Sequence, residues 1–112
     1  DDRLPGNPVI MIDATNHQRL RDEWTRFFSS FPHLRQVGLS GTLLTDAGLD
    51  GLADIAGLES LYLAETKITD AGLTKLSGCK NLRYLDVEGT QVTAAGVAKL
   101  KAANPRCEVL SK

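Results

Sequence analysis

The chain has 112 residues, of which 42% are hydrophobic and 24% are charged, as is ordinary for one globular domain. Its 13 basic and 14 acidic residues are interspersed and give a formal net charge of −1. Nucleic acid or an anionic membrane surface would require a basic excess gathered in a patch, so neither partner is expected. No apolar run is long enough for membrane insertion, and two cysteines do not make a disulfide scaffold.

Residues 1–8 are polar and rich in turn-forming residues, which favours a linker or leader over a signal peptide. The apolar, β-branched run that follows predicts a first strand over residues 9–13. Asn16 is then expected to cap a helix that Pro32 ends. The apolar face of this helix combines five side chains: Leu20, Trp24, Phe27, Phe28 and Phe31. We interpret the stripe as core packing in a bulky cap unit over residues 9–33 rather than as a cofactor pocket.

One short motif divides the rest of the chain. Thr-Asp-Ala-Gly-Leu occurs at 45–49 and again at 69–73, and a relaxed copy, Thr-Ala-Ala-Gly-Val, lies at 93–97, each 24 residues after the last. The period predicts a repeat protein with three units and a closing segment, at residues 34–57, 58–81, 82–105 and 106–112. Each unit opens with alternating aliphatic residues, which predicts short strands near residues 36–39, 60–63, 84–87 and 108–110.

The motif itself is typical of a helix start. Its first residue is expected to cap the helix through a hydroxyl, at Thr45, Thr69 and Thr93. Asp46 and Asp70 follow in the first turn, where the helix dipole favours negative charge, and the third copy has Ala94 instead. Glycine costs a helix about 1 kcal/mol relative to alanine. Its recurrence in every copy therefore indicates close approach of a neighbouring backbone, at Gly48, Gly72 and Gly96.

The two cysteines and two histidines do not form a reactive site. Cys79 shares a repeat position with an isoleucine and an alanine, so we expect it in the core, and Cys107 closes the last coil. A bridge between them would join non-equivalent positions and is not expected. His17 and His33 are isolated and lack metal-ligand spacing. We therefore expect no catalytic residue, no cofactor and no metal.

The units resemble leucine-rich repeats of 24 residues. The second unit carries the resemblance most fully, as Leu58-x-x-Leu61-x-Leu63-x-x-Thr66-x-Ile68-Thr69-Asp70-Ala71-Gly72-Leu73-x-x-Leu76. More narrowly, they look like the Thr-Asp-Ala-Gly-Leu repeats abundant in planctomycete and related bacterial proteins, which are similar in architecture to ribonuclease-inhibitor-like repeats. The resemblance covers about residues 34–110.

The resemblance implies an α/β, right-handed solenoid with about five short parallel strands on a concave face and four helices on a convex face. Such repeats often carry asparagine in the turn after the strand, where this chain has Thr42, Thr66 and Thr90. Bonding between turns is therefore expected to use a hydroxyl. The resemblance also implies that a protein or peptide partner binds the concave face.

Strand alternation identifies the side chains on that face. They are Val9, Met11, Asp13, Gln36, Gly38, Ser40, Ser60, Tyr62, Ala64, Tyr84, Asp86 and Glu88. Tyr62 and Tyr84 are expected to be diagonal neighbours with charged residues beside them, an arrangement that suits protein recognition. The candidate partner-binding residues are Met11, Gln36, Tyr62, Arg83, Tyr84, Asp86 and Glu88.

A sheet of this size offers about 300–350 Å² in projection. A standard interface needs about 800 Å² from each partner. The sequence therefore predicts a non-catalytic module that binds a peptide or a weak partner, within a larger protein, as a monomer or with weak self-association. Two alternatives stay open. The domain could be a structural or self-associating spacer, or it could accompany an enzyme encoded in the same chain.

Overall fold

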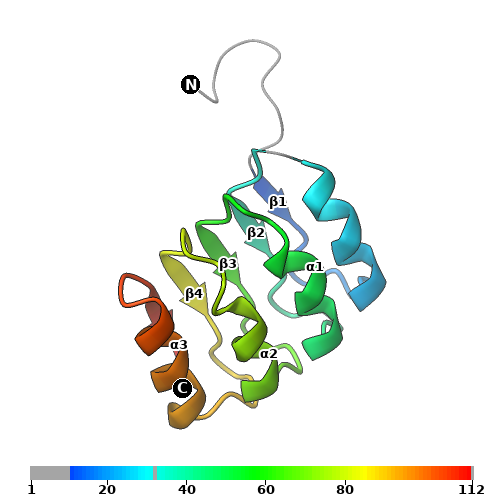
Figure 1. Cartoon of the computed structure of the whole chain (residues 1–112). Coiled ribbons are helices and arrows are strands. Elements are labelled where there is room, and N and C mark those ends of the chain that lie inside the picture. The colour runs from blue at the N-terminus through cyan, green and yellow to red at the C-terminus, as the bar shows by residue number, and fades with distance from the viewer. Residues whose placement is uncertain (1–10, 32, 112) are drawn as a thin grey trace.

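The computed structural model describes residues 11–31 and 33–111, and its centre is one parallel sheet with helices along one side (Figure 1). The five strands follow chain order in the sheet: β1 (Met11–Asp13), β2 (Gln36–Gly38), β3 (Ser60–Tyr62), β4 (Tyr84–Asp86) and β5 (Glu108–Leu110). Strands β2 to β5 pair in steps of 24 residues, so the sequence period sets the register. The predicted α/β solenoid is confirmed.

Helical segments return the chain from each strand to the start of the next. They are η1 (Asp22–Ser30), η2 (Asp46–Gly48) continuing into α1 (Leu49–Ala53), α2 (Asp70–Leu76) and α3 (Ala94–Ala103). All of them cover the same face of the sheet (Figure 1). Because parallel strands need such crossovers, placing them on one side leaves the other face of the sheet without a helix over it in the described part of the chain.

One apolar core runs through all the units. The opening leucines Leu34, Leu58 and Leu82 are fully buried, and so are the inward residues Leu44 and Ile68. Burying each such side chain contributes about 1.5–3 kcal/mol.

The strands are one residue shorter than predicted in units one to three. The fourth predicted residue still bonds the next strand through its amide N–H, as Leu39 does to the Tyr62 carbonyl at 2.8 Å. The predicted strand residues 9 and 10 lie outside the described part of the chain.

The cap unit differs from its prediction. Asn16 is not a helix cap, because it lies in a turn with a left-handed φ of 64°, and η1 begins only after Arg21. The segment is also a 3₁₀ helix, in which residues three apart align along one face. Thr25 and Phe28 therefore share the buried face, whereas Trp24 and Phe27 are exposed at 42% and 69%.

The core interpretation of the aromatic stripe is thus wrong for Trp24 and Phe27 and correct for Leu20 and Phe28. The error comes from applying a helical period of 3.6 residues to a segment with about 3.0 residues per turn. Trp24 instead lies beside the ring of His17, with 5.7 Å between ring centroids. Pro32, predicted to end the helix, lies outside the described residues, and the helix ends at Ser30.

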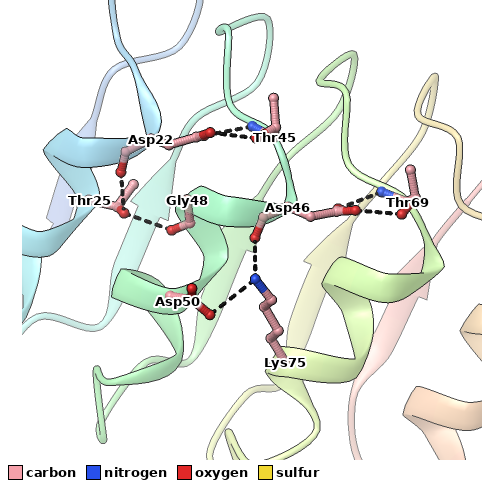
Figure 2. A network of polar contacts seen from close by, with 8 residues as sticks. All are labelled: Asp22, Thr25, Thr45, Asp46, Gly48, Asp50, Thr69 and Lys75. Carbon is pink, nitrogen blue, oxygen red and sulfur yellow. Dashed lines mark hydrogen bonds and ion pairs between the residues drawn. The ribbon is translucent and has the colours of Figure 1, made fainter.

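A ladder of aspartates and threonines links consecutive coils on the helix side (Figure 2). Thr45 donates both its amide N–H and its hydroxyl to the carboxylate of Asp22, 23 residues earlier. Thr69 donates in the same way to Asp46, at 2.7 Å from the amide and 2.5 Å from the hydroxyl. Thr93 repeats the pair of bonds to Asp70. We call these three links the aspartate–threonine ladder.

The ladder changes the predicted role of the motif. The Thr45 hydroxyl makes no cap bond to its own helix, so that prediction is wrong, whereas Thr69 and Thr93 accept long bonds of 3.3 and 3.4 Å there. Asp46 and Asp70 do lie in a first helical turn, as predicted, but their carboxylates bond the next coil. A carboxylate can accept several bonds at once, which makes it a suitable connector between coils.

The motif glycine makes room for this ladder. A Cβ atom on Gly72 would lie 2.2 Å from the Asp46 Oδ1 atom and 2.7 Å from the Leu49 Cδ1 atom. The neighbour is therefore mainly an aspartate side chain rather than the backbone that we predicted. Backbone does approach Gly48, as predicted, since its Cβ would lie 3.2 Å from the Asp22 Cα atom. Backbone approaches Gly51 more closely, since the Cβ there would lie 2.8 Å from the Thr25 carbonyl oxygen.

The turn threonines do not join the turns to one another as expected. The hydroxyls of Thr42 and Thr66 each donate to a carbonyl three residues earlier in the same unit, at 2.7 Å. Bonds between turns use mostly the backbone, as from the Lys67 amide to the Leu44 carbonyl at 3.1 Å, and one hydroxyl, that of Ser40, which accepts the Ala64 amide at 3.1 Å. The hydroxyl is close enough to its own backbone to bond there first.

Candidate partner-binding face

The uncovered side of the sheet carries two complete rows of side chains in register. We call this side the open sheet face. The first row consists of Met11, Gln36, Ser60, Tyr84 and Glu108. The second row consists of Asp13, Gly38, Tyr62, Asp86 and Leu110. Their inward neighbours on the strands pack against the core, so strand alternation turns both rows away from the helices.

The structure brings most of the predicted candidates together. Met11, Gln36 and Tyr84 are exposed in the first row, and Tyr62 and Asp86 are half-buried in the second. Tyr62 and Tyr84 are diagonal neighbours as predicted, because Tyr62 pairs with the residue two after Tyr84.

Two candidates lie at the margins of the face. Glu88 is half-buried and lies just beyond the end of β4, where alternation continues the face into a third row. Arg83 is exposed and lies one residue before β4. At that same margin Arg35 pairs with Glu59 at 4.0 Å.

Apolar side chains are exposed on this face. Met11, Tyr84 and Leu110 are 49%, 41% and 43% exposed. Leu110 and its neighbour Glu108 were missed as candidates, although the inward Val109 between them gives the same alternation that identified the rest. The position of β5 matches its prediction, in which it is only the closing strand of the solenoid.

Register sets each tyrosine beside a carboxylate of the following strand. Tyr62 pairs with Asp86, and Tyr84 pairs with Glu108. Adjacent strands lie about 4.8 Å apart, so each ring and its carboxylate can contact one ligand group together. The sequence period alone could have given both pairs, since the two residues of each pair are 24 apart.

Local hydrogen bonds fix two of the face carboxylates. The Asp13 carboxylate accepts the Thr15 hydroxyl at 2.7 Å and the Thr15 amide at 3.0 Å, and these bonds hold the pKa of Asp13 below its usual range. Asp86 accepts the Glu88 amide at 3.1 Å through one oxygen. Ionised carboxylates with such fixed positions favour cationic ligands.

Both cysteines are buried and unbridged, as predicted. Burial raises the pKa of Cys79, and the nearby Asp54 charge raises it further. Burial likewise raises the pKa of Cys107. A thiol that stays protonated is a poor nucleophile, so neither side chain has the character of a reactive site.

Two hollows lie between helices on the other side of the molecule. One of about 450 Å³ separates α2 from α3, and one of about 280 Å³ separates η1 from α1. Neither is lined by a residue of the open sheet face. Within residues 11–31 and 33–111, no three metal-binding side chains gather and no helix is long and apolar enough to cross a membrane.

Sequence comparison identifies the repeats. Residues 58–77 and 78–101 match the family model described as Leucine Rich repeat. These residues, which span most of the second and third units, match leucine-rich repeats. Comparison with curated proteins gives no match.

Solved structures share the fold at low sequence identity. The actin-binding site 2 domain of leiomodin-1 matches with a TM-score of 0.73 and 15% identity, over 92% of this chain and 70% of that one. Internalin C2 from Listeria monocytogenes matches with a TM-score of 0.54 and 17% identity, over 92% and 61%. A leucine-rich repeat protein from Leptospira interrogans matches with a TM-score of 0.54 and 18% identity, over 82% and 28%. The chain thus spans under two thirds of the two bacterial proteins. At these identities the likeness concerns the fold.

Proposed function

We propose that this chain is a non-catalytic module that binds a protein or peptide on its open sheet face. The observation that carries the proposal is the exposure of Met11, Tyr84 and Leu110 on one face, with Tyr62 half-buried among them. Apolar and aromatic side chains exposed together on a rigid scaffold are typical of protein recognition.

The distribution of residues over the units supports the same function. Gln36, Ser60 and Tyr84 occupy equivalent positions in the first row yet differ in size and chemistry. Packing between coils therefore does not require a particular side chain there, and the positions are free to serve a ligand. The related leiomodin-1 domain is named an actin-binding site, so a domain of this fold has served as a binding surface.

The dimensions favour a small partner. Five strands spaced about 4.8 Å apart and about 10–17 Å long give roughly 240–400 Å². This is about half or less of the roughly 800 Å² that a standard interface takes from each partner. The expected ligand is therefore an extended peptide, or a protein that also contacts strand margins and loops.

Selection from a random peptide library displayed on phage tests the proposal. Peptides that bind the wild-type domain should lose binding to the double variant Tyr62→Ser and Tyr84→Ser. They should keep it with Phe27→Ser, which removes an exposed aromatic residue from η1 instead. Amide chemical shifts in NMR spectra should change along β2 to β5 when a selected peptide is added. Binding that maps to the helices, or survives the double tyrosine variant, would contradict the proposal.

A further inference from the structure

The open sheet face is more acidic than the chain as a whole. Four carboxylates lie on it, at Asp13, Asp86, Glu88 and Glu108, and its rows contain no lysine or arginine among the described residues. The whole chain has 13 basic and 14 acidic residues, so the balance on this face is a local feature. A face with one sign of charge attracts ligands of the opposite sign.

The acidic residues are arranged around the two tyrosines. Asp86 lies across from Tyr62, and Glu108 lies across from Tyr84. A guanidinium or ammonium group can stack on a tyrosine ring and at the same time bond a carboxylate, since the ring face and the carboxylate both attract cations. Each tyrosine–carboxylate pair therefore has the composition of a cation site.

Both pairs have capacity left for a ligand. The hydrogen bond from the Glu88 amide uses the Oδ1 atom of Asp86. Within the described part of the chain, the Asp86 Oδ2 atom, the Glu108 carboxylate and both tyrosine hydroxyls make no hydrogen bond or ion pair. A ligand would thus not have to displace an existing contact.

We propose that the open sheet face binds an extended partner segment with two basic side chains, one on each tyrosine–carboxylate pair. The pairs are offset by one strand and by two residues along it, which is about 8 Å. In an extended segment, every second side chain lies on the same side of the backbone, and two such side chains start about 6.6 Å apart. Long basic side chains can bridge the remaining distance to pairs about 8 Å apart. The ligand class is therefore a basic-x-basic peptide. This inference rests on the proposed binding function.

Blocked synthetic peptides provide the probe. Gly-Arg-Gly-Arg-Gly, acetylated and amidated, should shift the amide signals of Tyr62, Tyr84 and their strand neighbours in NMR titrations at low salt. The glutamine analogue should bind at least about fivefold more weakly, because it lacks both the cation–π and the ionic contact. The glutamate analogue should show no saturable shift on this face. Raising the salt concentration should weaken the binding of the arginine peptide more than that of its analogues, since its contacts are exposed and ionic.

Variants of the domain test whether the arginine peptide binds the two tyrosine–carboxylate pairs or is attracted by negative charge anywhere on the surface. The double variant Asp86→Asn and Glu108→Gln should weaken the arginine peptide about three- to tenfold. Asparagine keeps an oxygen for the Glu88 amide, so the local backbone bond is retained. The matched control, Glu23→Gln with Asp54→Asn, removes two negative charges from exposed positions off the face and should change binding less than twofold. Tyr62→Phe with Tyr84→Phe keeps both rings and should bind nearly as wild type.

The results distinguish this inference from the broader function. Equal affinity for the arginine and glutamine peptides, or equal losses in the site variant and the control variant, would overturn the cation sites. If library peptides bind the open sheet face but carry no basic residues, the inference falls and the binding function stands. If library peptides do not contact this face at all, both fall.

Discussion

The helix side and the open sheet face of the same units are built by different rules. On the helix side, equivalent positions repeat: Asp46 and Asp70 bond Thr69 and Thr93 in the same geometry. On the sheet face, equivalent positions such as Ser60 and Tyr84 differ. On the helix side, the repeated aspartates and threonines are therefore those that bond the next coil, whereas the varied residues Ser60 and Tyr84 lie on the open sheet face. In a solenoid, each unit is stabilised mainly by its neighbours, so the same residue type is needed at equivalent positions where coils meet.

The two ends of the aspartate–threonine ladder refine this rule. The cap unit contributes Asp22 as an acceptor but has Arg21 at the position of the threonine. The third unit contributes Thr93 as a donor but has Ala94 at the position of the aspartate. Within this chain the ladder therefore runs from Asp22 to Thr93. The relaxed third copy of the motif differs from the other two at the position of the acceptor, because Ala94 has no carboxylate.

The largest expected effect comes from filling the space beside the ladder. Gly72→Val should lower the free energy of unfolding by about 3 kcal/mol or more, because its side chain would overlap Asp46 and Leu49 and displace the hydrogen bonds from Thr69 to Asp46. Thr74→Val, two residues later on the exposed side of α2, should change the free energy of unfolding by less than about 0.5 kcal/mol. Urea denaturation measures both. Similar small losses in the two variants would refute the packing argument.

Removing one carboxylate of the ladder should have a smaller but clear effect. Asp46→Ala leaves the amide and hydroxyl of Thr69 without their acceptor, which should cost about 2 kcal/mol. The control is Asp50→Ala, which removes only an exposed ion pair with Lys75 at 3.1 Å and should cost less than about 1 kcal/mol. Thermal unfolding of both variants gives the comparison. A loss with Asp50→Ala as large as with Asp46→Ala would mean that the ladder adds no more than a surface ion pair.

Much of the fold follows from the sequence because the period is strict. The 24-residue spacing predicts the parallel register, and the aliphatic positions predict the core, as Leu61 and Leu85 show by pairing across β3 and β4. The cap unit is less predictable, since its helical period is that of a 3₁₀ segment and a single copy offers no internal comparison. The burial predicted for Trp24 and Phe27 is wrong because it assumed an α-helical period, and both side chains are exposed on the 3₁₀ segment.

The candidate face was predictable in position but not in chemistry. Alternation along the strands identifies Tyr62 and Tyr84, and the 24-residue spacing gives their partners Asp86 and Glu108, yet neither pattern shows which carboxylate oxygens are left without a hydrogen bond. The ladder was not predicted, although its aspartates and threonines were noticed. A motif read within one unit suggests a helix cap, and only the three-dimensional arrangement shows that the carboxylate bonds the threonine of the following unit.

The smallest expected effect is on the pH dependence of stability. It is compared between one carboxylate of the aspartate–threonine ladder, Asp70, and one of the open sheet face, Asp13. Hydrogen bonds from the Thr93 hydroxyl and amide lower the pKa of Asp70, and bonds from Thr15 lower the pKa of Asp13. A lowered folded-state pKa stabilises the protein above the ordinary value near pH 4, and this stability is lost as the pH falls through the folded value. Asp70→Asn and Asp13→Asn should each flatten the decline in unfolding free energy between about pH 4 and pH 2.

The two variants should differ at neutral pH. In Asp13 one oxygen, Oδ1, accepts both bonds from Thr15, so the oxygen of an asparagine can replace it. In Asp70 the amide of Thr93 bonds Oδ1 and the hydroxyl bonds Oδ2, so an asparagine must turn its NH₂ group toward one of two donors. Asp70→Asn should therefore melt at a lower temperature than wild type at pH 7, while Asp13→Asn stays close to it. Equal melting temperatures would show that the bonds between coils are no more demanding than the local turn on the sheet face.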